Sequence, residues 1–139
     1  MNAVDFILAG MLAAATPMLL AALGEMVVER SGVLNLGLEG MMALGAALGF
    51  ITTYTYGSHA LGFVVAAFGG AALSLVFALI VLGFVANQVA AGLAIGILGT
   101  GLSSLFGKSF ESLTIDGLPK LALPLLSDLP VVGVLFVQD

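Results

Sequence analysis

The chain alternates between long apolar stretches and short polar connectors. Four stretches are apolar enough and long enough to cross about 30 Å of hydrocarbon, and they cover residues 6–28, 36–56, 60–86 and 88–107. We expect each to be an α-helix, because a backbone in lipid must satisfy its own hydrogen bonds and the alternating pattern of barrel strands is absent. The connectors ERSGVLN, GSH and ANQ are short, so successive helices should run antiparallel.

The last stretch of the chain, residues 108–139, has a different pattern. Prolines and the pairs Asp-Gly and Ser-Asp interrupt its apolar residues too often for one continuous helix. We therefore predict an irregular segment that lies against the bilayer. The alternative is a fifth span that begins near Leu121, since the sequence VVGVLFV is apolar.

Composition agrees with a chain that lies mostly in a membrane. Of its 139 residues, 61% are hydrophobic and 8% are charged, against roughly 25% charged residues in an ordinary soluble domain. The net charge of −5 has the wrong sign for binding nucleic acid. The chain has no Cys, which excludes disulfides, thiolate metal sites and Cys nucleophiles. The first residues, MNAVDF, lack the cationic start of a signal peptide, so we expect the first apolar stretch to stay as a span.

Small residues recur one helical turn apart in three of the predicted helices. Such pairs let helix backbones approach closely in a membrane. We therefore predict close helix packing at the following positions: Gly45 and Gly49, Gly62, Ala66 and Gly70, and Gly92 and Gly96.

The main candidate site lies in ERSGVLNLGLEGMM, between the first two apolar stretches. Glu29 and Arg30 suit a solvated helix end at the level of the lipid headgroups. Glu39 is different, because a spanning helix that ends at Tyr56 must begin at or before Leu36 and so places this acid inside the membrane edge. An acid there costs on the order of 2–3 kcal/mol and normally faces a polar interior or a water-filled path.

Glycine on both sides of this acid adds a second indication of transport. Gly37 and Gly40 weaken the helix and would allow an unwound segment whose backbone groups point into a cavity, as in transporters with broken helices. Catalysis finds little support: His59 is the only histidine and is predicted to lie in a short loop, where such a side chain is usually solvated. The sequence has no metal-binding His pair, no nucleophile elbow and no phosphate-binding loop. We therefore expect no enzyme and no cofactor, with any ATP bound by a separate ATPase subunit.

Three segments of the sequence closely resemble a known family. ATPMLLAALGEMVVERSGVLNLGLEGMMALGA, VANQVAAGLAIGILGTGLSSLFGKSF and LSDLPVVGVLF resemble the permease subunits of bacterial ABC importers for nucleosides and simple sugars, a group related to branched-chain amino acid and ribose permeases. The resemblance implies a multi-pass protein of the bacterial cell (inner) membrane. It also implies three partners: a second permease subunit, a cytosolic ABC ATPase and an extracytoplasmic substrate-binding protein.

The resemblance assigns roles to particular positions. Asn35, Gly37, Glu39 and Gly40 match the family's discontinuous segment, which lines the central pathway. Asn87-Gln88 matches a cytoplasmic turn, which places the N-terminus and residues 108–139 outside and ERSGVLN inside. Counting positive charges favours the opposite orientation, since Arg30 would lie inside against Lys108 and Lys120 outside, but three cations decide little.

Family members are longer, and their second half carries the loop that docks on the ATPase. We therefore expect residues 1–139 to be the N-terminal half of a larger polytopic permease, as a fragment or a truncation. Two other functions stay open: a small proton-coupled exporter and a remnant that inserts without transporting. An exporter of that kind would carry its acid within the first span, whereas here the first span has no acid until Glu25, near its end.

Overall fold

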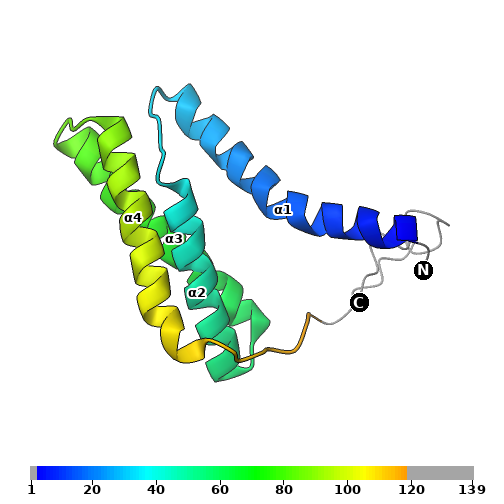
Figure 1. Cartoon of the computed structure of the whole chain (residues 1–139). Coiled ribbons are helices and arrows are strands. Elements are labelled where there is room, and N and C mark those ends of the chain that lie inside the picture. The colour runs from blue at the N-terminus through cyan, green and yellow to red at the C-terminus, as the bar shows by residue number, and fades with distance from the viewer. Residues whose placement is uncertain (1–2, 119–139) are drawn as a thin grey trace. The chain divides into compact units, whose positions relative to one another are not determined.

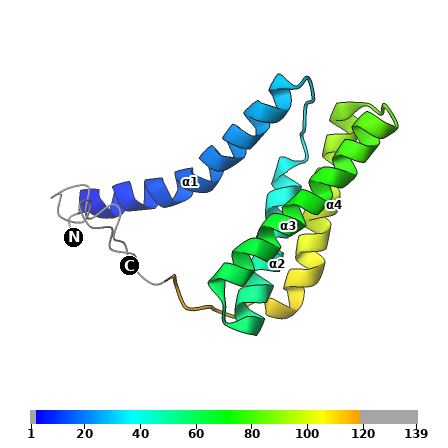
Figure 2. The same cartoon turned by 180° about the vertical axis from the view of Figure 1, so that it is seen from behind.

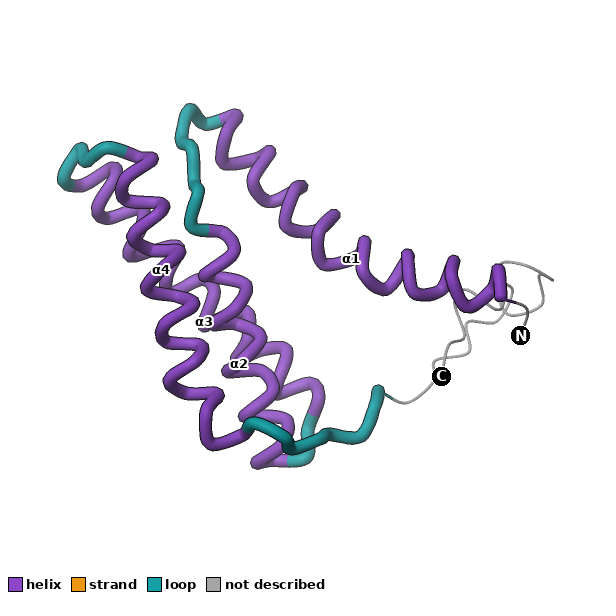
Figure 3. The backbone as a smooth tube through the Cα atoms, in the orientation of Figure 1, coloured by secondary structure: helices purple, strands orange, loops and turns teal. Residues whose placement is uncertain are grey.

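The computed structural model describes residues 3–118, and their regular structure is helical throughout (Figure 1). The helices are α1 (Ala3–Arg30), α2 (Leu38–Tyr56), α3 (His59–Ala78), the π-helical turn η1 (Leu79–Gly83), α4 (Gln88–Gly107) and the 3₁₀ turn η2 (Lys108–Phe110). Figure 3 shows the same helices separated by short loops. The prediction of an all-α protein is confirmed for this part of the chain.

The described chain divides into two compact units. One unit contains Met1–Gly24 and Gly117–Asp139, and its described helical residues belong to α1. The other unit, Glu25–Asp116, holds the last turns of α1 together with α2, α3 and α4. We call this second unit the helical unit, and the candidate site lies within it.

Three of the helices are long and apolar enough to cross a membrane. Within residues 3–118 they are Gly10–Arg30, His59–Gly83 and Gln88–Phe110. α2 is not among them, because Glu39 near its start and the polar sequence TTYTY at its end lower its mean hydropathy. The expectation of several membrane spans is therefore confirmed, while the fourth crossing, by α2, stays a prediction.

The helix limits differ from the predicted spans by one to three residues, except for α4, and two of these differences lengthen the connectors. α2 begins at Leu38 rather than at residue 36, because Leu36 belongs to the preceding loop. The third helix continues through η1 and ends at Gly83, before its predicted limit at residue 86. A short connector follows and ends at Asn87. The side-chain oxygen of Asn87 accepts a hydrogen bond from Ala90 N–H (3.0 Å) and so caps the start of α4.

α2 packs against both α3 and α4 through small residues (Figures 1 and 2). A Cβ atom added to Gly45 would lie 2.9 Å from the carbonyl oxygen of Ala66, and one added to Gly49 would lie 3.1 Å from that of Gly62. These distances leave little or no room for a side chain. The predicted close packing at these positions is therefore confirmed, and it brings the backbones of α2 and α3 into contact.

A small apolar core lies where the three helices meet. Its buried members are Met41, Leu44, Leu73, Phe77, Val81, Ala91 and Ile95. Many other large apolar side chains of the helical unit are exposed, for example Ile97 at 75% and Phe63 at 64%. Such an apolar exterior is expected of helices surrounded by lipid or by further protein.

The segment after α4 is irregular as far as the structure describes it. η2 ends at Phe110, and residues 113–118 have no regular structure. The rest of the predicted irregular segment, including the alternative fifth span near Leu121, lies outside the described residues. His59 is the first residue of α3, not a loop residue, and its Nε2 atom lies 2.9 Å from the carbonyl oxygen of Asp116. The expectation of a solvated loop histidine is thus corrected, because this side chain holds the segment against the α2–α3 turn.

Candidate functional site

A non-helical segment, residues 31–37, separates α1 from α2. It begins with a turn in which the N–H of Gly32 donates to the carbonyl oxygen of Glu29 (2.9 Å). Gly32 has a φ of +83°, a conformation that a residue with a side chain adopts only at a cost. The connector predicted between the first two apolar stretches is therefore present. The unwound segment predicted around Glu39 is not, because Gly37 is the last non-helical residue and both Glu39 and Gly40 belong to α2.

Side chains from two other helices hold this segment in place. The side-chain oxygen of Gln88, in α4, accepts a hydrogen bond from Leu34 N–H (2.7 Å), and its amide nitrogen donates to the carbonyl oxygen of Gly32 (3.3 Å). A carboxylate oxygen of Glu25, in α1, accepts from Asn35 N–H (2.9 Å). These bonds satisfy backbone groups that no helix satisfies, which matters most where water is scarce.

Sequence reasoning missed the roles of Glu25 and Gln88. It placed Glu25 near the end of a span and read Gln88 only as part of a turn. One indication of these roles is present in the sequence: Glu25 and Gln88 are long polar side chains beside apolar helix ends, and such side chains can reach a neighbouring loop. Their partners could not be found from the sequence, because the bond from Gln88 to Leu34 joins residues 54 positions apart.

Asn35 is the buried polar residue of the segment, with 7% of its surface exposed. Its side-chain oxygen accepts a hydrogen bond from Gly37 N–H (2.9 Å), which forms a turn that leads into α2. Its amide nitrogen lies 3.5 Å from the sulfur of Met41, one turn into that helix. Asn35 therefore shapes the segment from within, and its amide faces the protein interior.

Gly37 and Gly40 lie where α2 meets α4 at the closest approach. A Cβ atom added to Gly37 would lie 2.8 Å from the carbonyl oxygen of Gly92, and one added to Gly40 would overlap the backbone of Gly96. The reverse holds for Gly99, whose added Cβ would overlap the backbone of Gly40. Gly37 caps α2, whereas Gly40 is in regular helix. These glycines therefore serve backbone contact, and the non-helical conformation stops at Gly37.

Glu39 lies in the first turn of α2, and its side chain is exposed on the surface of the helical unit. It borders a groove of about 220 Å³ between α2 and α4. The other residues that line this groove are Leu36, Gly40, Leu93, Gly96, Ile97 and Thr100. The hydroxyl of Thr100 lies 3.0 Å from the carbonyl oxygens of both Gly96 and Ile97, so it has acceptors within its own helix. Because the carboxylate of Glu39 is exposed beside this groove, it can accept hydrogen bonds from a group outside the helical unit.

The loops of the helical unit lie at two opposite ends. Residues 31–37 and the α3–α4 connector share one end, as the bonds of Gln88 to Gly32 and Leu34 require (Figures 1 and 3). The α2–α3 turn and the segment after α4 share the other end, where His59 meets Asp116. This arrangement agrees with the antiparallel order predicted for the helices of this unit, and which end faces the cytoplasm stays a prediction.

The chain is similar in sequence to known permease proteins. Residues 7–120 match the family described as branched-chain amino acid transport system / permease component. Three relatives are similar over most of this chain: a putative glucose ABC transporter permease protein of Haloferax volcanii (44% identical over 130 residues), a guanosine ABC transporter permease protein of Bacillus subtilis (34% over 136) and a nucleoside ABC transporter permease protein of Lactococcus lactis (29% over 145). No solved structure matches the chain.

The matches cover 91%, 90% and 97% of this chain but 40%, 43% and 46% of the respective relatives. The chain therefore spans less than half the length of the curated relatives it matches. The family match extends from α1 through α4 and so contains every residue of the candidate site. Together with the apolar helices, it shows that this is a membrane protein and that the chain belongs to the family of branched-chain amino acid transport system permease components.

Proposed function

We propose that the chain forms part of the permease component of an ABC importer for nucleosides or simple sugars and contributes to its translocation pathway. The observation that carries the proposal is the similarity to permeases named for glucose, guanosine and nucleosides, which covers at least 90% of the chain in each case. The helical unit supports it, because its exterior is apolar and offers further helices a large surface to pack against.

Within this proposal, α2 is a fourth membrane crossing. It lies side by side with α3 and α4, each of which is long and apolar enough to cross (Figure 2). The loop before α2 runs beside the first turn of α4, so α2 begins next to Gly92 and ends at the turn that leads into α3 (Figure 1). Glu39 then lies near one face of the membrane, within the first turn of a spanning helix.

In this proposal, three of the four candidate residues shape the pathway and one contacts the solute. Asn35 and Gly37 shape the loop that leads into α2, and Gly40 allows α2 to approach α4. Glu39 is the member that can meet the solute, because its carboxylate is exposed beside the α2–α4 groove. A carboxylate accepts hydrogen bonds from the hydroxyl and amino groups that sugars and nucleosides carry.

The importer requires partners beyond this chain. We infer a second permease subunit, a cytosolic ABC ATPase that binds the ATP, and an extracytoplasmic substrate-binding protein. The resemblance to nucleoside and sugar permeases and the family match support all three. The proton-coupled exporter is disfavoured, since Glu25 lies near the end of the candidate span Gly10–Arg30 and not within its middle.

The first prediction tests the function itself. Deleting residues 1–139 from the complete permease should abolish ATP-dependent uptake of labelled guanosine or glucose by cells that carry the whole importer. Residues 1–139 expressed alone should enter the membrane but support no uptake, because the helical unit leaves most of its apolar exterior uncovered. Uptake that survives the deletion, or that the short chain supports with the ATPase alone, would contradict the proposal.

The second prediction tests which end faces outward. A Cys at Ser112 should react with an impermeant thiol reagent added outside intact cells, whereas a Cys at Ser31 should react only after the membrane is opened. Both residues are exposed at opposite ends of the helical unit, so access to the reagent is the only difference expected. Labelling in the reverse order would invert the orientation.

A further inference from the structure

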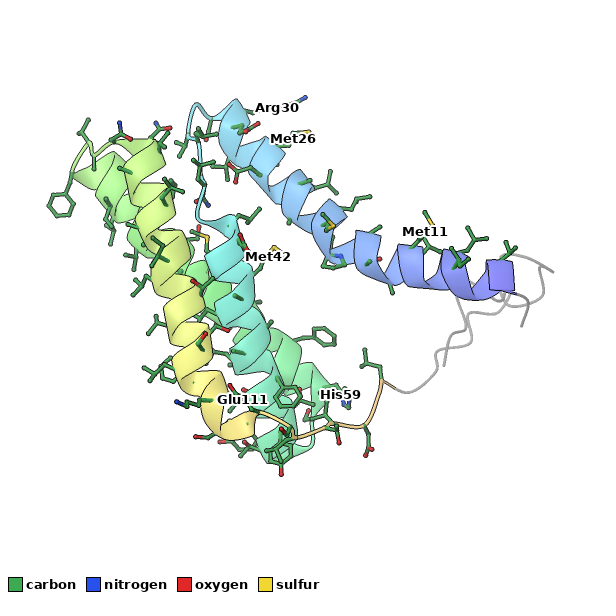
Figure 4. The ribbon with its side chains drawn as sticks, in the orientation of Figure 1. Met11, Met26, Arg30, Met42, His59 and Glu111 are labelled. Atoms are coloured by element: carbon green, nitrogen blue, oxygen red, sulfur yellow. The ribbon has the colours of Figure 1, made fainter. Side chains whose placement is uncertain are left out.

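A polar hollow lies at the opposite end of the helical unit from residues 31–37. It has a volume of about 260 Å³ and is formed by the end of α2, the start of α3 and the segment after α4. Its lining includes Tyr54 from α2, His59 from α3, and Thr114 and Asp116 from that segment. Figure 4 labels His59 at this end, beside the segment that follows Glu111.

The chain builds this hollow from local turns and one long-range contact. Gly57 adopts a left-handed conformation (φ +64°) that reverses the chain directly after α2, and its N–H donates to the carbonyl oxygen of Thr53 (2.8 Å). The contact of His59 Nε2 with the carbonyl oxygen of Asp116 (2.9 Å) then holds the far wall in place. Because a carbonyl only accepts, Nε2 donates in this bond.

Tyr54 forms the aromatic wall of the hollow, and two other aromatic rings hold it in position. The ring of Tyr54 stacks on Phe50, with ring centroids 6.5 Å apart, and meets Phe110 edge-on at 5.8 Å. Phe110 belongs to η2, so the same aromatic contacts that position Tyr54 also fix the start of the segment after α4. The hollow is therefore a shaped site made by three parts of the chain.

The lining chemistry indicates which solutes would bind. The lining residues carry two hydroxyl groups (Tyr54 and Thr114), an imidazole (His59) and a carboxylate (Asp116). These groups both donate and accept hydrogen bonds, as a solute with several hydroxyl groups requires. No Lys or Arg is among the described residues that line the hollow, so the carboxylate of an amino acid or the charge of a phosphate would find Asp116 without a compensating cation.

We propose that this hollow is a solute-binding site for neutral hydroxylated molecules, such as a sugar or the ribose part of a nucleoside. The inference rests on the proposed function and adds a second point of solute contact, separate from Glu39. Thr53 also lines the hollow, and it lies fourteen positions after Glu39 on α2, or about 21 Å along the helix axis. In the proposed orientation the hollow opens on the extracytoplasmic side, where a substrate-binding protein releases its solute.

The test uses the complete importer in proteoliposomes, with a permease that carries a single Cys at Thr114. An excess of D-ribose or D-glucose should slow the reaction of this Cys with an impermeant maleimide several-fold, whereas L-leucine should not. Thr114 is exposed in a segment without regular structure, so the replacement should not disturb folding. A Cys at Ser112, which is exposed in the same segment but does not line the hollow, should react equally fast with and without sugar.

A second variant tests whether the sugar protects the Cys at position 114 by binding to the residues that line the hollow. Adding Asp116→Asn to the Thr114 Cys permease should reduce the protection by sugar, because it removes an acceptor and a charge. Uptake measured on the same proteoliposomes separates the two proposals. Normal sugar or nucleoside uptake without protection at Thr114 would overturn this site and leave the proposed function standing. Protection by L-leucine equal to that by sugar would overturn the solute class, and failure to transport any hydroxylated solute would overturn the proposed function.

Discussion

Gly99→Ala in α4 is expected to destabilise the permease and to abolish most of its uptake. The added methyl group would overlap the backbone of Gly40 in α2, and a backbone cannot rotate away as a side chain can. α2 and α4 would have to separate, and overpacking of this kind costs about 1–3 kcal/mol. The measurement is the thermal unfolding midpoint of the purified importer, together with uptake in proteoliposomes.

Gly101→Ala provides a matched control on the same helix. Among the described residues, a Cβ atom added to Gly101 would meet nothing within 4 Å. This variant should unfold at the same or a slightly higher temperature, because alanine favours a helix over glycine by up to about 1 kcal/mol. Equal unfolding temperatures for Gly99→Ala and Gly101→Ala would show that α2 and α4 are not in backbone contact.

Glu39→Gln in the complete importer is expected to lower uptake at least several-fold at an unchanged amount of assembled protein. Glutamine keeps the size of the side chain but loses its charge and half of its acceptor capacity. Because Glu39 is exposed on the helical unit, the change disturbs no packing inside it. A loss of uptake would therefore report the role of the carboxylate in the pathway. Uptake is measured with labelled solute, and assembly by quantifying the purified complex.

The control for this change is Glu29→Gln, which removes the same charge from the exposed last turn of α1. It should leave uptake nearly normal, since an exposed surface charge contributes little. Full uptake by Glu39→Gln as well would make Glu39 an ordinary residue at a helix start. Gly40→Val cannot serve in its place, because its side chain would overlap the backbone of Gly96 and act through packing.

Much of the local structure follows from the sequence alone. The apolar stretches locate all four helices, and the predicted limits of the last one, 88–107, agree with α4. Asn87 supplies a side-chain cap at the start of that helix, which is a property of neighbouring residues. The membrane character follows from composition, since a chain with 8% charged residues cannot cover such helices with a polar surface. Signals of this kind depend on residues close together in the chain.

The roles of the candidate site residues depend on the fold more than the helix limits do. The sequence located Asn35, Gly37, Glu39 and Gly40, but only the structure separated a buried amide from an exposed carboxylate and from glycines in backbone contact. Each difference arises from which face of α2 meets α4, and the small residues on both helices permit more than one pairing.

Long-range partners were decided by tertiary structure alone. The bond from Leu34 to Gln88 and the contact of His59 with Asp116 join residues 54 and 57 positions apart. A polar residue in the sequence shows that a partner is needed, since an unpaired polar group away from water is costly. It does not show which partner, because that depends on how the helices pack and which chain ends they bring together. The sequence alone determined the helices and their membrane setting, whereas helix packing determined which polar groups meet between them.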